Sequence, residues 1–327
     1  MSRILFLFFV ILLPLSVFSG VTIQCNNPKY ASQKLAFYSY SDPVSQQTNP
    51  VFTLETDGNG KASKTVEITT VKFVFCDFGI YRGLLFLEPG QTITLKLPPV
   101  REKTFADEKN PYFKPVTFWF ETENAAQLNN QVARFTARLN QLTDQYFDPL
   151  YFRQSKPYLD SLKIRIDKEF GAVKNENFIL NKQFALKQVE VDAFRLKPES
   201  YATVFNDIKP VFWQFPAFTD LFEKAFSGLL SFDAKTVGGD NLKKAVNQGN
   251  TQGLLDHLKK KYKVTGDAAD LALLKMLHDG WYSGDFSKTS IQQMLKVARF
   301  TGHQNPVIRE TAENISAKIG FLQTGSA

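Results

Sequence analysis

The sequence predicts an α+β fold in two domains, an N-terminal antiparallel β-sandwich followed by an all-α helical domain. Three observations support this prediction. Apolar residues alternate with polar ones from Val21 to about Leu97, whereas from about Glu123 they recur every three or four residues. The 327 residues suffice for two domains, and 43% hydrophobic with 22% charged residues is typical of globular proteins. Phe is used 31 times, so we expect aromatic packing to dominate the interior.

Residues 1–19 have the features of a secretory signal peptide. Arg3 supplies a positive charge, Ile4 to Val17 is an apolar run, and small residues precede Gly20, where we expect cleavage. The apolar run is shorter than the ~20 residues that a membrane-spanning helix needs. We therefore expect an exported protein, periplasmic or associated with the outer surface, without a transmembrane segment after cleavage.

Residues 20–120 are expected to form the sandwich. In Val71–Cys76 and Ile93–Leu97 every second side chain is apolar, as in strands with one buried face. Val116 to Phe120 is expected to return as one more strand. Between these strands, Pro98–Pro115 carries four prolines and a mixed charge cluster, so an ordered connection is expected there.

Two turn sequences separate the predicted strands. Asp57-Gly58-Asn59-Gly60 lies between Val51–Thr56 and Lys61–Thr69 and predicts a β-hairpin, because glycine adopts the positive φ that such turns need. Pro89-Gly90 predicts a second turn, in which proline fixes φ and glycine takes the left-handed conformation. Short strands at this spacing favour a small sandwich.

Residues 121–322 are expected to form the helical domain. Apolar side chains at steps of three and four residues share one face of successive helices. Stretches with this spacing begin at Leu128, Leu159, Phe178 and Ile291, and the last is expected to reach Ala298. Because each period needs its own core, we expect two independently packed units with a boundary between Pro98 and Glu123.

The last helix is predicted to begin at Asn305-Pro306, a cap followed by a first-turn proline. Its inward face carries Ile308, Ala312, Ile315 and Ile319. Residues 323–327 follow as a tail or as the start of a linker to a further domain. No repeat of fixed period is visible, which argues against a solenoid.

The chain contains no complete catalytic constellation. Cys-x-x-Cys, Gly-x-Ser-x-Gly, a phosphate-binding glycine loop and His-Glu-x-x-His are all missing from the sequence. Two cysteines and three histidines rule out a zinc ribbon and a His-rich metal site. We therefore expect no catalytic residue, no cofactor and no metal, and the residues present favour a protein without enzymatic activity of its own.

The three histidines and the basic residues are interpreted as structural. His278 shares a predicted helix face with apolar residues, so we expect an interior histidine with satisfied hydrogen bonds. His257 and His303 are expected on the surface near helix ends. The densest basic run, Lys259–Lys261, continues a helix whose Leu258 faces inward, so a solvated face is expected. The net charge of +7 is spread along the chain, and we expect no nucleic-acid partner.

Two further features leave alternatives open. Export would allow Cys25 and Cys76 to form a disulfide, but two separate buried thiols are an equally good interpretation. The most aromatic stretch of the chain contains Phe212, Trp213, Phe215 and Phe218. If these rings were exposed they would mark a partner or ligand surface. A buried corner between two helices is the interpretation we favour, because large aromatic side chains are mostly interior.

Four segments resemble a known family. Leu84–Leu95 resembles the strand–turn–strand motif of the N-terminal β-domain in exported thioredoxin-like proteins of the Bacteroidota. The turn Asp57–Lys61 is similar to that domain's Asp-x-x-Gly-x-Phe hairpin, although Ala62 replaces the usual aromatic residue. Phe215–Phe222 and Leu271–Tyr282 resemble two segments of the helical region that follows the β-domain in that family.

In that family a C-terminal thioredoxin fold of the TlpA or peroxiredoxin-like type follows the helical region. The resemblance implies that this chain is the non-catalytic accessory region of an extracytoplasmic thiol–disulfide oxidoreductase-like protein, which positions the redox domain or binds its client. It also implies that the parent protein continues past Ala327. It carries over no catalytic residue, because Cys25 and Cys76 do not have the Cys-x-x-Cys spacing. The alternative is a free-standing exported binding or scaffold protein that recognises a peptide, a glycan or a protein partner.

Overall fold

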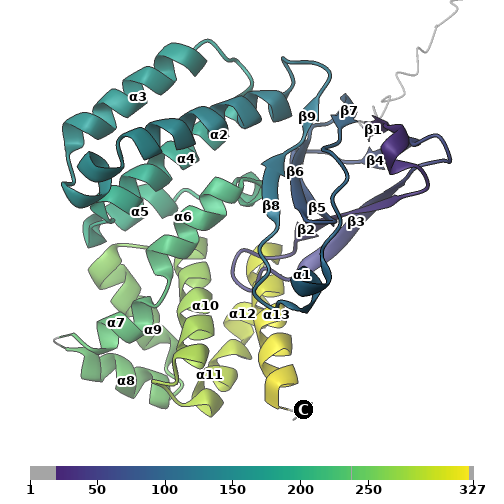
Figure 1. Cartoon of the computed structure of the whole chain (residues 1–327). Helices are drawn as coiled ribbons and strands as arrows, with labels where there is room; N and C mark the ends of the chain where they lie inside the picture. Colours follow the sequence, from purple (N-terminus) through teal and green to yellow (C-terminus); the bar gives the residue numbers. More distant parts are fainter. Residues whose placement is uncertain (1–19, 237, 324–327) are drawn as a thin grey trace, which may run out of the picture.

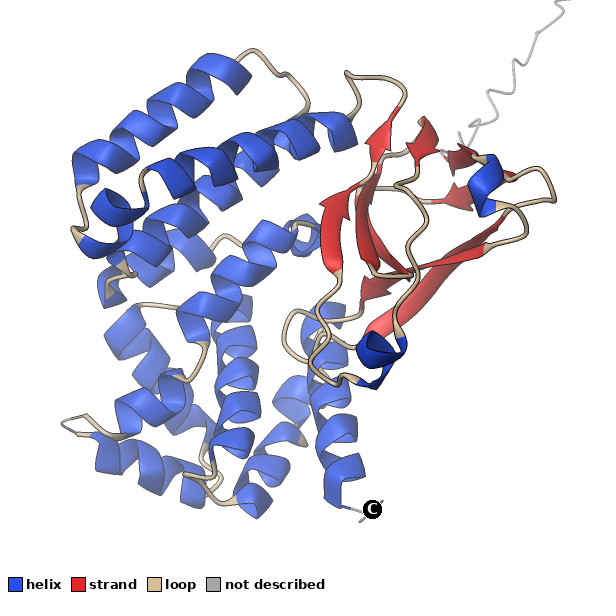
Figure 2. Ribbon diagram, viewed as in Figure 1, coloured by secondary structure: helices blue, strands red, loops and turns tan. Residues whose placement is uncertain are grey.

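The computed structural model describes residues 20–236 and 238–323 (Figure 1). A β region of two sheets over residues 20–122 is followed by a helical region from residue 128, so the predicted α+β fold class is confirmed. Figure 2 shows most of the helices gathered on one side of the strands, whereas two short helical segments of the β region lie beside the strands themselves. The predicted signal peptide and residues 324–327 of the predicted tail lie outside the described residues.

The β region is a sandwich of two sheets. In chain order its strands are β1 (Gly20–Asn26), β2 (Lys34–Tyr40), β3 (Thr48–Glu55), β4 (Lys61–Glu67), β5 (Lys72–Phe78), β6 (Tyr81–Leu87), β7 (Thr92–Lys96), β8 (Val116–Trp119) and β9 (Glu121–Thr122). One sheet has the order β4-β1-β7-β9 and the other the order β3-β2-β5-β6-β8. Apolar side chains from both sheets meet in one buried cluster, which is the core of the sandwich.

Strand pairing differs from the prediction in two ways. β1 pairs with β7, and β6 with β8, in parallel, so the sandwich is mixed and not purely antiparallel. The turn Asp57–Gly60 is present, and Gly60 has a φ of +75°, but it does not close a hairpin. β3 pairs with β2, whereas β4 pairs with β1 in the opposite sheet. A turn sequence specifies that the chain reverses, but the sheet that the next strand joins depends on packing at a distance.

Twelve α-helices lie in the described part of the helical region. They are α2 (Leu128–Gln145), α3 (Lys156–Phe170), α4 (Glu176–Phe194), α5 (Tyr201–Phe205), α6 (Pro216–Phe226), α7 (Leu229–Ala234), α8 (Gly239–Asn247), α9 (Thr251–His257), α10 (Gly266–Ser283), α11 (Lys288–Leu295), α12 (Ala298–Thr301) and α13 (Pro306–Gln323). A short helix, α1 (Phe105–Lys109), lies in the connection between β7 and β8. Single turns of 3₁₀-helix cover Pro28–Tyr30, Pro198–Ser200 and Pro210–Gln214, and π-helical turns cover Asp148–Phe152 and Leu258–Tyr262.

The predicted apolar faces of the long helices are buried. In α2 every predicted inward residue from Leu128 to Leu142 is buried, and the same holds for α3 and for Ile308 to Ile319 of α13. The late helix is shorter than expected, because α11 ends at Leu295 and Ala298 begins the separate α12. These helices fold as predicted because their pattern is local.

The helices share their core with the five-stranded sheet. Phe73 and Phe86, on the outer face of this sheet, belong to the same buried cluster as the helical residues, and Val44 of the β2–β3 loop joins them. Their neighbours Val74 and Leu85 face the core of the sandwich instead. The sheet is therefore apolar on both faces, contrary to the expectation of two independently packed units.

Amide side chains of the helical region complete the hydrogen bonding of the strands. β8 pairs with β6 only as far as Leu84, and beyond that point Asn129 of α2 takes over. Its Oδ1 accepts a hydrogen bond from the main-chain N–H of Phe86 at 2.7 Å, and its Nδ2 donates one to the carbonyl of Phe86 at 2.8 Å. Gln214 likewise accepts from the N–H of Phe73 at 3.1 Å. Because buried main-chain groups must be paired, these amides act in place of a neighbouring strand.

We predict that Asn129→Ala lowers the free energy of unfolding by about 2–3 kcal/mol, because it leaves both main-chain groups of Phe86 buried and unpaired. Urea unfolding monitored by circular dichroism measures the change. Asn140→Ala is the matched control, since Asn140 lies on the same helix with an exposed side chain. The control should change stability by less than about 0.5 kcal/mol. Equal losses for both variants would show that the Asn129 amide does not hold the sheet.

Candidate functional site

Both cysteines are free thiols buried in the sandwich core. Cys25 lies on β1 and Cys76 on β5, which belong to different sheets. Burial raises the pKa of both thiols, that of Cys76 to about 12. Since the thiolate is the reactive form of cysteine, both side chains behave as apolar core residues. Of the two alternatives that the sequence left open, the structure has the separate thiols.

The aromatic stretch forms a corner between helices, as favoured from the sequence. Two of the four residues of the predicted partner surface are buried in it. Phe215 and Phe218 are fully buried, with ring centroids 5.7 and 4.8 Å from that of Phe184 in α4. These two rings are therefore unable to meet a partner. Phe212 and Trp213 are only half-buried, and Trp213 lines a cavity.

This cavity, of about 220 Å³, lies where the β region meets the helices, and we call it the junction pocket. Its walls come from segments far apart in the sequence. They include Tyr40 and Asp42 at the end of β2 and in the loop after it, Phe73 of β5, Trp213 and Asp220 at the helical corner, and Val307 of α13. Trp213 is the only predicted site residue among them.

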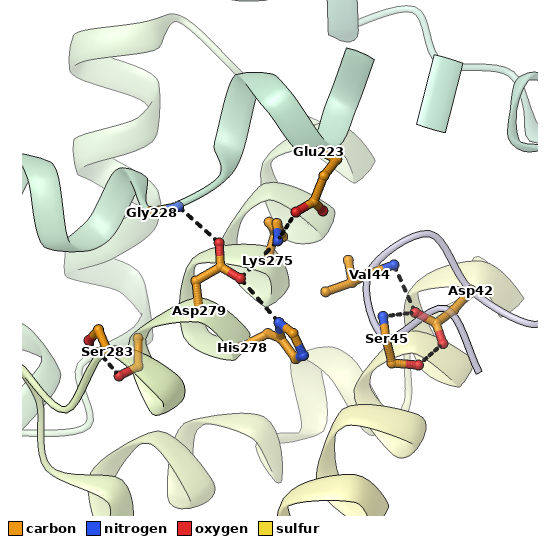
Figure 3. Close-up of polar contacts among 10 residues, drawn as sticks. Asp42, Val44, Ser45, Glu223, Gly228, Lys275, His278, Asp279 and Ser283 are labelled. Carbon is orange, nitrogen blue, oxygen red and sulfur yellow. Dashed lines mark hydrogen bonds and ion pairs between the residues drawn. The ribbon is translucent and has the colours of Figure 1, made fainter. Parts of the chain in front are cut away.

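Asp42 fixes the β2–β3 loop that forms one wall of the pocket (Figure 3). Its Oδ1 accepts hydrogen bonds from the main-chain N–H groups of Val44 at 2.9 Å and Ser45 at 2.6 Å, and its Oδ2 accepts one from the Ser45 hydroxyl. The Nδ2 of Asn314 in α13 donates to the same Oδ2 at 2.9 Å. The loop is therefore fastened to the helical region, and Val44 is held in the shared core.

The charged groups that line the junction pocket are carboxylates. Among the lining residues that the structure describes, Asp42 and Asp220 carry charge, and no Lys, Arg or His is present. Asp220 is exposed at the edge of the pocket, and partial loss of hydration raises the pKa of its carboxyl group. Lys224, one turn later in α6, opposes this shift, but its ammonium is bound to both oxygens of Asp192 at 2.6 Å. Asp220 therefore contributes negative charge that its neighbours compensate only in part.

A buried charge network lies one turn further along α6 (Figure 3). The ammonium of Lys275 in α10 donates to Glu223 Oε1 at 2.7 Å and to Asp279 Oδ1 at 2.8 Å. Asp279 also accepts from the N–H of Gly228 at 2.9 Å and contacts Nδ1 of His278 at 3.1 Å. Burial acts to raise the pKa of Asp279, but the hydrogen bonds from His278 and Lys275 outweigh it and lower the pKa. The network ties α10 to α6 and to the turn before α7.

The three histidines differ from the prediction. His278 is interior, but only its Nδ1 has a partner, and its Nε2 is buried without one. His257 and His303 were expected on the surface, yet their side chains are 23% and 17% exposed and contact buried carboxylates. Nε2 of His257 lies 2.6 Å from Asp233, which is 24 residues away in the sequence. Because these partners are brought together only by helix packing, no local pattern identifies them.

The described residues contain no group of three or more His, Cys, Asp or Glu side chains arranged to bind a metal ion. Within the same residues, every helix is too short or too polar to span a bilayer. No protein-family model, curated protein or solved structure matches the chain. The resemblance to exported thioredoxin-like proteins therefore stays a prediction.

Proposed function

We propose that the described part of the chain is a non-catalytic binding module, and that it takes a cationic side chain of a peptide or protein client in the junction pocket. If the resemblance holds, the module is the accessory region of an exported thiol–disulfide oxidoreductase-like protein and the client is one that it presents to the redox domain. A free-standing exported binding protein would use the same pocket. The observation that carries the proposal is an aromatic-walled pocket whose charged lining is carboxylate.

The size and lining of the pocket suit one long cationic side chain. At about 220 Å³ it is smaller than the ~300–1,000 Å³ of most small-molecule sites. The rings of Tyr40 and Trp213 attract a cation through their π-faces, and Phe73 offers apolar contact to an aliphatic stem. Asp220, an exposed side chain at the edge of the pocket, would receive the ammonium or guanidinium group through a charge-assisted hydrogen bond.

The same lining supports a role without catalysis. Nucleophilic catalysis requires a nucleophile beside a general base. Among the described lining residues the hydroxyl groups belong to Tyr40, Ser41 and Thr219, and no His, Cys or Lys accompanies them. The hydroxyl of Ser41 donates to the carbonyl of Gln47 at 3.0 Å, so it is engaged in holding the loop.

Two matched probes test the proposal. Nα-acetyl-lysine amide and Nα-acetyl-norleucine amide share an aliphatic stem, but only the first carries an ammonium group. We predict that the lysine probe binds at least about tenfold more tightly, and that Asp220→Asn removes this difference. Nuclear magnetic resonance titration of the tryptophan indole signals measures both affinities. Trp213→Ala should weaken both probes and identifies the signal of Trp213.

Asp160→Asn is the control for general charge effects, because Asp160 is an exposed residue of α3 outside the pocket. It should leave the affinity for the lysine probe unchanged. If the two probes bind equally, or if Asp160→Asn acts as strongly as Asp220→Asn, the junction pocket is not a cation site.

A further inference from the structure

A second cavity lies among α7, α8 and α9, at the end of the helical region that Figure 1 shows far from the sandwich. Its volume is about 710 Å³, about three times that of the junction pocket and within the range of small-molecule sites. We call it the α7–α9 pocket. Nothing in the proposed function uses it.

One wall of this pocket is built on the buried carboxylate of Asp233. At the end of α7, this side chain is fully enclosed and accepts hydrogen bonds from three groups. Nε2 of His257 lies at 2.6 Å, Nζ of Lys261 at 2.6 Å and the hydroxyl of Tyr262 at 2.9 Å. Burial acts to raise the pKa of Asp233, but the hydrogen bonds from His257, Lys261 and Tyr262 outweigh it and lower the pKa. Asp233 is therefore an anion that positions its neighbours and is itself closed to a ligand.

A π-helical turn brings these three donors to one carboxylate. Leu258–Tyr262 is π-helical and directly follows α9. His257 and Tyr262 are five residues apart, which is the hydrogen-bond spacing of a π-helix and exceeds one turn of an α-helix. Regular α-helix would rotate Tyr262 away from the face that carries His257. Single π-helical turns inside helices are rare and occur frequently at functional sites.

The groups that face the cavity are predominantly cationic. His257 and Lys261 line it. Because Nε2 of His257 contacts Asp233, Nδ1 is the imidazole nitrogen that could meet a ligand. Lys244 of α8 and Lys260 of the π-helical turn line it as well. The second carboxylate in the wall, Asp256, accepts a hydrogen bond from Gln252 at 2.8 Å.

The charge and the polar groups of the lining define the ligand class. Three lysines stand against two carboxylates, one of them enclosed, so the cavity has an excess of positive charge even with His257 neutral. The side-chain amides of Asn241, Gln248 and Asn250 add N–H donors, and no Phe, Tyr or Trp ring lines the described part of the wall. Ammonium, imidazole and amide groups together favour oxyanions. We infer that the α7–α9 pocket binds a small molecule bearing a carboxylate or phosphate group.

Lys260 and Lys259 provide a matched pair of variants. Both are exposed neighbours in the same basic run, but only Lys260 lines the pocket. The full chain is titrated by calorimetry with inorganic phosphate and with acetate at constant ionic strength. We expect saturable binding of at least one probe, weakened about tenfold by Lys260→Ala or Lys244→Ala and unchanged by Lys259→Ala. Comparing the two probes distinguishes a phosphate site from a carboxylate site.

Other outcomes overturn the inference. If neither probe binds at concentrations up to ~10 mM, the cluster around Asp233 only ties α7 to α9. If Lys259→Ala weakens binding as much as Lys260→Ala, the anion responds to surface charge and not to the pocket. Asp220→Asn should leave phosphate and acetate binding unchanged, so failure at this site is distinguishable from failure at the junction pocket. Because the lysine variants change exposed side chains, their unfolding midpoints should match that of the unmodified chain.

Discussion

Lys275→Met is expected to lower the free energy of unfolding by about 3–5 kcal/mol, because it removes the cation of a buried network and leaves the anions in place. The side chain of Lys275 is only 3% exposed, and methionine fills a similar volume without a charge. Asp279, whose side chain is 17% exposed, would remain beside His278 without its ammonium partner. Glu223 is 36% exposed and regains hydration, so we expect a loss nearer the lower end of this range. Urea unfolding at neutral pH measures it.

A triple variant separates the loss of charge balance from the loss of packing. Lys275→Met combined with Glu223→Gln and Asp279→Asn keeps the shape of the network but removes the charges of its lysine and of both carboxylates. Replacing a whole buried ion network costs far less than removing one partner, so the triple variant should recover most of the lost stability. If the triple variant is no more stable than Lys275→Met alone, the effect of Lys275 lies in packing and not in charge balance.

The position of Lys275 in the structure illustrates what the sequence of α10 could and could not predict. Its run of apolar residues indicates a helix buried on nearly all sides, and Leu271 and Leu274 are indeed buried. A lysine in such a run has to find anions, but the sequence does not say which. Glu223 is 52 residues away on another helix, and only the packing of α6 against α10 brings the two together. Local periodicity predicts which residues are buried, whereas the partner of a buried charge depends on tertiary packing.

The strands show the same division. The alternation in β5 predicted a strand with one buried face, yet both alternating sets are apolar, with Phe73 and Phe75 on one side and Val74 and Cys76 on the other. Strands buried on both faces are read from such near-continuous apolar runs, so the shared core with the helices had a signal in the sequence. The parallel pairing of β1 with β7 had none, since it joins segments about 70 residues apart.

The two candidate sites were beyond local sequence patterns for a related reason. The aromatic stretch drew attention to Trp213, but Asp42 and Val307, which line the same pocket, lie about 170 and 90 residues away. In the α7–α9 pocket the run Lys259–Lys261 was visible as charge. Two lysines of this run line the pocket only because they lie in a π-helical turn, which no local sequence pattern predicts. Residue types were informative at both sites, whereas their grouping depended on the fold.

Gly60→Ala is expected to lower the free energy of unfolding by about 3–4 kcal/mol, for a reason that lies wholly in the backbone. Gly60 has a φ of +75°, in the region that side chains disfavour by about 1 kcal/mol or more. A Cβ atom there would also lie 2.0 Å from the carbonyl oxygen and 2.5 Å from the carbonyl carbon of Asn27. The N–H of Asn27 donates to the carbonyl of Gly60 at 2.9 Å, so this close approach holds β1 beside the start of β4. The end of β1 and the turn that contains Gly60 would have to move apart to admit a methyl group.

Gly90→Ala provides the control, because the two glycines share a conformation and differ in their surroundings. Gly90 has a φ of +76°, and a Cβ atom built on it would meet nothing within 4 Å. Its substitution should therefore show only the conformational cost of about 1 kcal/mol. The difference between the two variants, about 2–3 kcal/mol in urea unfolding, measures the contact with Asn27. Equal losses would mean that β1 and the turn after β3 move apart freely, and that the close approach at Gly60 does not hold the two strands together.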